Sequence, residues 1–153
     1  MVIALTETDD GTKEKTQREL SQIKKKLPHE SRQKFDEIME KVLMTALQLV
    51  PIDTGALASS IRIVEGALGG ASGNIKEVLI FDKTIIAGDE MLINPKTGKP
   101  VNYAMYVHDG YSLPDGGWKD GTYFLTMAIS QHYQELEEAI NRVTEYLNNK
   151  GSE

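Results

Sequence analysis

Residues 51–60 read PIDTGALASS, and they separate a helical first part of the chain from a strand-rich second part. Before them, apolar residues recur at helical spacing, as Phe35, Ile38, Met39, Val42, Leu43, Ala46, Leu49 and Val50. This spacing predicts a long helix, and Pro51 ends it because proline removes a backbone donor. After them, residues 60–64 alternate between polar and apolar side chains, which is typical of a strand.

The stretch itself predicts a structural elbow. Asp53 or Thr54 can cap a short new helix by accepting hydrogen bonds from nearby backbone amides. Gly55 permits a tight turn of the backbone. Leu57 and Ile61, four residues apart, are spaced to return apolar side chains to the core. We therefore expect these residues to hold the helix-to-strand connection.

The triplet Asp53-Thr54-Gly55 also matches the one that carries the catalytic carboxylate of aspartic proteases. That chemistry needs two carboxylates about 3 Å apart that share one proton, so a single triplet would have to act in a homodimer. Each aspartate would also follow a buried strand, whereas here a predicted helix leads into the triplet. The sequence favours the structural elbow and no catalytic residue, with a homodimeric protease using Asp53 as the alternative.

The remaining patterns predict an α+β fold in one domain. Apolar and β-branched residues at 77–86 and 101–108 are typical of strands, and apolar periodicity from Thr122 to about Leu147 predicts a last helix. Composition predicts loops at 66–74, 94–99 and 109–121. We expect roughly two or three helices packed on a small antiparallel sheet. The chain divides into an N-terminal arm and helix at 1–27, a core domain at 28–147 and a disordered tail at 148–153.

The predicted helix at residues 13–26 has a thin apolar stripe that includes Leu20 and Ile23. Such a helix needs the body of the protein or a neighbouring subunit to cover it. Lys24, Lys25 and Lys26 give it a basic end, which makes a small nucleic-acid-binding domain a further alternative. A solvated helix end, where lysines complement the helix dipole, is the simpler interpretation.

The composition excludes several classes of site. The chain has 153 residues, a net charge of −6 and no cysteine, so general nucleic-acid affinity is disfavoured and thiolate sites are excluded. No apolar run reaches the length of a membrane span, and residues 1–10 do not match a signal peptide, so we expect a protein made in the cytoplasm. The glycine-rich segment at 66–74 lacks a phosphate-loop pattern, and we expect no cofactor.

The histidines do not have the spacing of metal ligands. His108 and Asp109, with Asp115 and Asp120, could gather a cation, although acidic loops are usually only solvated. His132 falls on the apolar stripe of the last helix, where we expect a partly buried and hydrogen-bonded side chain.

Three blocks of residues together resemble a known family. The first is Pro51-x-Asp53-Thr54-Gly55-x-Leu57-x-x-Ser60-Ile61 after a long helix, and the second is Tyr103-Ala104-x-Tyr106-Val107-His108-x-Gly110. The third is Phe124-Leu125 with Ala128 at the start of the last helix. Their order resembles the neck and tail-completion proteins of tailed bacteriophages over roughly residues 35–140. Tyr111, where the family often has threonine, and Thr122-Tyr123, where a proline is usual, depart from its pattern.

The resemblance implies a structural virion protein that forms or completes a ring at the head–tail junction and performs no catalysis. It implies a homo-oligomeric ring of roughly six- or twelve-fold order, contacts with connector and tail proteins, and passive contact with DNA in the channel. Such a protein is assembled in the host cytoplasm and does not enter a membrane. We expect its interfaces to include Leu20, Ile23, Lys24, Lys25, Lys26, Gly69, Gly70, Tyr111 and Trp118.

Overall fold

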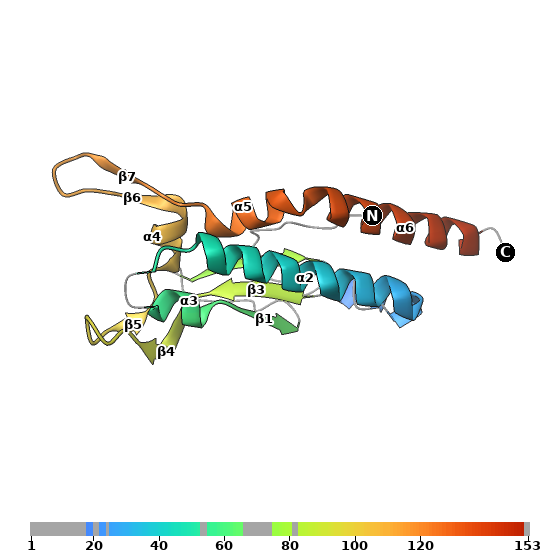
Figure 1. The fold of residues 1–153 in the computed structure, drawn as a ribbon, viewed down its shortest axis with the longest axis horizontal. Coiled ribbons are helices and arrows are strands. Elements are labelled where there is room, and N and C mark those ends of the chain that lie inside the picture. Colours follow the sequence, from blue (N-terminus) through green and yellow to red (C-terminus); the bar gives the residue numbers. More distant parts are fainter. Residues whose placement is uncertain are drawn as a thin grey trace.

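The computed structural model describes residues 18–19, 22–23, 25–52, 55–65, 75–80 and 83–151, and it confirms the α+β class. The long helix α2 (His29–Leu49) lies between a three-stranded sheet and the C-terminal helices α5 (Phe124–Gln131) and α6 (Tyr133–Gly151) (Figure 1). Within the described residues there are five helices and three small antiparallel sheets, more elements than the sequence predicted. No described helix is long and apolar enough to cross a membrane.

The main sheet has the strand order β1-β3-β2, and both pairings are antiparallel. Its strands are β1 (Arg62–Glu65), β2 (Lys76–Ile80) and β3 (Lys83–Ala87). The apolar stretch at 77–86 is therefore two strands, which pair from Lys76 opposite Ala87 to Ile80 opposite Lys83. The smaller sheets pair β4 (Asp89–Ile93) with β5 (Pro100–Val101), and β6 (Gly110–Ser112) with β7 (Trp118–Asp120).

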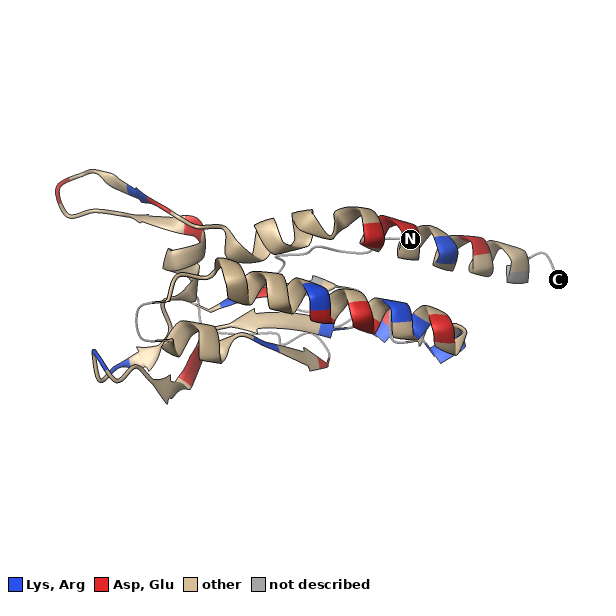
Figure 2. Cartoon of the chain, in the orientation of Figure 1, with Lys and Arg blue, Asp and Glu red and all other residues tan. Residues whose placement is uncertain are grey.

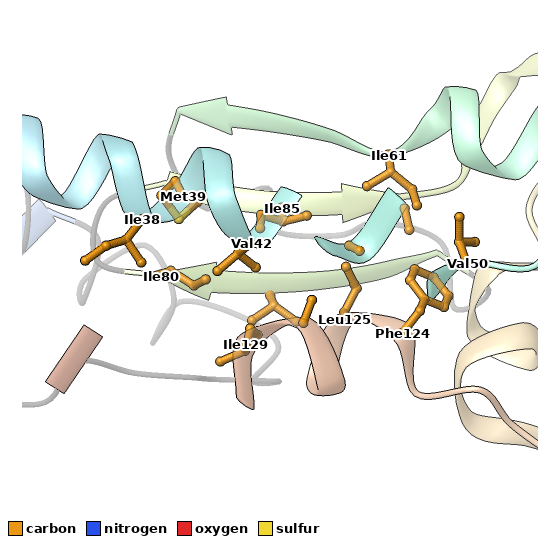
Figure 3. Close-up of a cluster of buried hydrophobic side chains, with 14 of the residues drawn as sticks. Ile38, Met39, Val42, Val50, Ile61, Ile80, Ile85, Phe124, Leu125 and Ile129 are labelled. Atoms are coloured by element: carbon orange, nitrogen blue, oxygen red, sulfur yellow. The ribbon is translucent and has the colours of Figure 1, made fainter. Parts of the chain in front are cut away.

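The core lies between α2, the main sheet and α5. The apolar face predicted for α2 is buried at Phe35, Ile38, Met39, Val42 and Ala46. Figure 3 shows Val42 of α2, Ile85 of β3 and Leu125 of α5 directed into this common core. Burial of such side chains is the main favourable contribution to folding. It accounts both for the apolar spacing along α2 and for the packing of α2 against the main sheet and α5.

The elbow between α2 and the sheet contains a short helix, α3 (Ala56–Ser60). Leu57 and Ile61 are buried in the core, as predicted. Gly55 precedes α3 with a φ of +78°, a left-handed conformation that disfavours other residues. The residue at the cap position is Gly55 and not the expected Asp53 or Thr54, both of which lie outside the described residues.

The Ser60 hydroxyl connects the elbow to the start of β4. It donates to Leu57 O at 2.6 Å and accepts from Gly88 N at 2.8 Å. Gly88 has a φ of +100°, and a Cβ there would lie 3.2 Å from Val101 O and 3.4 Å from Ala104 Cβ. The backbone at Gly88 is therefore enclosed by the elbow on one side and by the segment that leads into helix α4 (Ala104–Asp109) on the other.

The prediction that residues 101–108 form a strand is wrong. Only Val101 is in a strand, and α4 places Tyr106 and His108 on a helix, with Tyr103 at the residue before it. Ala104 and His108, four residues apart, are both buried on one helical face. The strand-like composition is overridden because packing decides the conformation of so short a segment.

The prediction that residues 109–121 form a loop is also wrong, because β6 and β7 make a hairpin that projects from the body (Figure 1). The expected last helix is broken at His132, whose φ of −112° separates α5 from α6. The helix α6 then continues to Gly151, beyond the expected end at Leu147.

The first helix is described only at a few positions. Ile23 is partly buried against the core, and Leu27 just after it is 4% exposed, so the body covers part of the apolar stripe. Lys25 and Lys26 are exposed. The expected interface residues Leu20, Lys24, Gly69 and Gly70 lie outside the described residues.

Replacing Ser60 with alanine tests the elbow. The change Ser60→Ala removes the acceptor of a buried backbone N–H, so we expect the free energy of unfolding to fall by about 1–3 kcal/mol. The matched control is Ser59→Ala, because the exposed Ser59 hydroxyl donates to the Gly55 carbonyl of its own turn. Urea denaturation followed by circular dichroism measures both. Equal stabilities of the two variants would contradict the structural role of Ser60.

Candidate functional site

The second block of the resemblance forms one wall of an exposed groove. The helix α4 directs Ala104 and His108 into the protein, while Tyr106 is 45% exposed. The β6–β7 hairpin leaves the C-terminal end of α4 at Gly110 and forms the other wall. The groove, with a volume of about 730 Å³, is lined by Tyr103, Tyr106, Val107, Gly110, Tyr111, Ser112 and Trp118. We call it the aromatic groove.

Most of the groove surface is apolar, and its aromatic side chains are open to solvent. Trp118 is 57% exposed and Tyr111 is 40% exposed. Tyr106 and Tyr111 make an edge-to-face contact with ring centroids 6.2 Å apart. Clustered exposed aromatic residues are typical of protein interaction sites, because a partner gains much buried area for little side-chain ordering.

Two glycines fix the position of the hairpin. Gly110 has a φ of +91°, and a Cβ there would lie 2.5 Å from Lys119 O and 2.8 Å from Trp118 Cζ2. A Cβ at Gly121 would overlap the carbonyl oxygen of His108. The amides of Thr122 and Tyr123 donate to the carbonyls of Val107 and His108, both at 2.9 Å. The base of the hairpin is therefore attached closely to α4, while its tip projects.

A buried histidine supports the groove from beneath. His108 is 1% exposed, and its ring makes edge contacts with the rings of Tyr123 and Phe124. The Thr126 backbone N–H donates to His108 Nε2 at 3.3 Å. Because that amide can only donate, Nε2 accepts and Nδ1 carries the ring proton, which it donates in a hydrogen bond to Asp109 Oδ1 at 2.5 Å. The imidazole thus connects α4 to the start of α5.

Asp109 extends this network to the main sheet. Lys76 Nζ, on a buried side chain of β2, lies 3.2 Å from Asp109 Oδ1. Partial burial acts to raise the pKa of Asp109, but the hydrogen bonds to His108 and Lys76 and the lysine charge outweigh it and lower the pKa below 3.8. The carboxylate therefore stays ionised at neutral pH and joins β2, α4 and α5.

The arrangement of Thr126, His108 and Asp109 resembles a catalytic hydroxyl–imidazole–carboxylate triad only in outline. The Thr126 hydroxyl lies 3.3 Å from His108 Nε2, but the same nitrogen already accepts from the Thr126 amide. His108 is also almost fully enclosed, at 1% exposed. We interpret the three residues as a structural support.

The possible cation site in this region is not formed. Among the described residues, no group of three or more histidine, aspartate or glutamate side chains is placed to hold a metal ion. His108 and Asp109 face the core network, whereas Asp115 and Asp120 are exposed on the hairpin. The hairpin geometry thus separates carboxylates that are close in sequence.

His132 has the partly buried, hydrogen-bonded environment that the sequence predicted. Its Nε2 lies 2.7 Å from the Thr45 hydroxyl of α2, and its Nδ1 lies 3.4 Å from Glu135. Glu135 also accepts from Lys41 at 2.7 Å, which raises the pKa of Lys41 and lowers that of Glu135. This set of hydrogen bonds connects α2 to the break between α5 and α6, and we interpret it as structural.

The structure brings together Tyr103, Tyr106, Gly110, Tyr111 and Trp118, all of which the sequence analysis singled out. It places the elbow residues Leu57, Ser60 and Ile61 in the core instead. Lys76 and Thr126 were missed because they belong to β2 and α5, far from the motif in sequence, and no local pattern marks them. The comparisons with protein-family models, curated proteins and solved structures found no match to this chain.

Neutralising Asp109 tests the network. At pH 7 we expect Asp109→Asn to lower the free energy of unfolding by about 1 kcal/mol, because solvent screens part of the interaction of this half-exposed carboxylate. The folded-state pKa is lowered, so this stabilisation is present above pH 3.8 and is lost as the pH falls below it. The difference from wild type should therefore shrink in acid.

Chemical denaturation between pH 2.5 and 7 measures the effect, with Asp115→Asn at the exposed hairpin tip as the control. A difference between Asp109→Asn and wild type that stays constant over this range would contradict the assigned ionisation.

Proposed function

We propose that this chain is a structural protein of a tailed bacteriophage or a phage-like particle. It forms or completes a ring at the head–tail junction, binds connector and tail proteins, and performs no catalysis. The observation that carries the proposal is the convergence of the three resembling sequence blocks on one buried joint. The shared order of the blocks along the sequence is by itself weak support for the proposal. Contacts in space between blocks that are distant in sequence are stronger support, because sequence spacing does not impose them.

The contacts of this joint run from the first block to the third. Ser60 of the first block binds the Gly88 amide, and Gly88 packs against Ala104 of the second. His108 of the second block then contacts the Phe124 ring of the third. Leu57, Ala104, Phe124, Leu125 and Ala128 all belong to the same buried cluster. The motif residues thus support the fold.

The exposed surfaces suit assembly more than chemistry. The aromatic groove is open, apolar and attached to a rigid base, which fits docking of a protein partner. The net charge of −6 suits passive contact with DNA, since an acidic protein does not hold the phosphate backbone strongly.

Deletion of the gene from the element that encodes it tests the proposal. We expect filled heads and tails that are separate, or tails of wrong length, because the joint is not completed. Electron microscopy of the lysate and a plaque assay measure this, and the gene supplied in trans should restore particles. Normal infectious particles after deletion would contradict the proposal.

The same complementation experiment distinguishes a structural role of Asp53 from a role in proteolysis. Asparagine has nearly the size of aspartate and keeps a hydrogen-bond acceptor but has no ionisable carboxylate, so Asp53→Asn should restore particles if the residue is structural. Failure of Asp53→Asn to restore particles, together with loss of a cleavage activity that wild-type protein possesses, would favour the protease alternative.

A further inference from the structure

We infer that the aromatic groove of one copy receives Met91 and Ile93 of a second copy, so that subunits join head to tail. This inference rests on the proposed ring-forming function and names the two surfaces that make the ring contact. Met91 and Ile93 belong to the segment 89–101, which contains β4 and β5 and which we call the β4–β5 wing.

The groove needs a partner because the hairpin buries little within its own chain. Every residue of β7 is exposed, as are Tyr111 and Ser112 of β6. A short two-stranded hairpin has marginal stability by itself in water. The Gly110–Gly121 base fixes its direction but leaves Trp118 largely in solvent. A second surface laid across the groove would cover these aromatic rings.

The β4–β5 wing has the complementary apolar side chains. Met91 is 88% exposed, the most exposed of the large apolar side chains described, and Ile93 is 52% exposed. The pairing of β4 with β5 is irregular between Asp89 and Ile93, and Asp89 Oδ1 accepts from Met91 N at 2.8 Å. This hydrogen bond within β4 stabilises the irregular part of the strand, so the backbone that carries Met91 is held in place.

The chemistry of these side chains favours this pairing. A methionine side chain adapts its shape to an irregular groove, and its sulfur makes favourable contacts with aromatic rings. The rings of Tyr106, Tyr111 and Trp118 supply such contacts. Within the described chain, Met91 and Ile93 do not line the groove of their own copy, so both surfaces stay open for a neighbour.

Charge and position agree with a second copy as the occupant. The turn at residues 94–99 carries Lys96 and Lys99 and no acidic residue, whereas the hairpin tip at 113–117 carries Asp115 and no basic residue. Figure 2 shows the end of the hairpin in red and the turn of the wing in blue; the opposite charges are confined to these two turns, because β7 also carries Lys119 and β4 carries two acidic residues. Figure 1 shows that both project from the same end of the molecule, so copies standing side by side bring a groove against a wing.

Two different surfaces that pair with each other make a heterologous contact. Each subunit then offers one free groove and one free wing, and the contact repeats until a ring closes or a filament grows. A contact between two grooves or two wings would stop at a dimer. This difference makes the proposed pairing testable by mixing variants.

The first part of the experiment removes one surface at a time. We expect Trp118→Ala and Met91→Asp each to weaken self-association by at least about tenfold, measured by sedimentation velocity. Both sites are exposed, and circular dichroism checks that the variants fold. Met44→Asp is the matched control, because Met44 is also exposed but lies on α2, outside both surfaces, and it should associate as wild type does.

The second part mixes the two deficient variants. Trp118→Ala keeps its wing and Met91→Asp keeps its groove, so the mixture should form one-to-one dimers that do not grow. Restored dimers support the heterologous contact. A mixture that stays monomeric, or single variants that assemble like wild type, would overturn it.

Cross-linking gives a readout that does not depend on affinity, since the chain has no natural cysteine. Ser112→Cys with Glu90→Cys places one thiol at the groove and one beside Met91. A short bismaleimide should link this double variant into a ladder of dimers, trimers and larger species. The control, Ser112→Cys with Glu40→Cys, moves the second thiol to the exposed surface of α2 and should not form a ladder.

Equal products from the two double variants would overturn the pairing, and so would wild-type protein that stays monomeric at every soluble concentration. The proposed function is judged separately by the particles that the deletion produces. If deletion disrupts the head–tail junction but this cross-linking pattern is absent, the proposed interface is wrong and the proposed function stands. If deletion leaves normal particles, the proposed function is wrong.

Discussion

The enclosed backbone at Gly88 is the constraint on which the relative placement of the elbow, sheet and α4 depends. Its N–H must find an acceptor where water does not reach, and the Ser60 hydroxyl supplies one. Its φ of +100° disfavours other residues, and a Cβ there would lie only 3.2 Å from Val101 O and 3.4 Å from Ala104 Cβ. The connection from the main sheet to the β4–β5 wing therefore depends on the positions of α3 and α4.

The position of α4 in turn determines where the exposed surfaces lie. The buried face of α4 is set by Ala104 and His108, so the opposite face must present Tyr106 to solvent. The hydrogen bonds of His108 to Asp109 and Thr126 then fix the end of α4 against α5. The hairpin leaves from that end through Gly110. A buried network of ordinary residues thus determines where an open aromatic groove lies.

Much of the fold could be predicted from sequence where the signal is periodic. The apolar spacing from Phe35 to Val50 predicts α2 and its buried face, because burial over many turns outweighs local preferences. The helix α4 could not be predicted, since its short sequence has a strand-like composition and becomes helical only through packing. The β6–β7 hairpin also lacks a periodic signal, and it depends on the close approach of Gly110 and Gly121. Sequence analysis selected Tyr111 and Trp118, but it could not show that Met91 is exposed.

We propose that this chain joins copies of itself around the head–tail junction through projecting aromatic and apolar surfaces. The most direct measurement is a cryo-electron microscopy reconstruction of the neck of the purified particle. We expect a ring of subunits with this fold, in which the β6–β7 hairpin of each covers Met91 of its neighbour. A neck without this chain would contradict the proposed function, and a ring in which the hairpins contact no neighbouring copy would contradict the proposed interface.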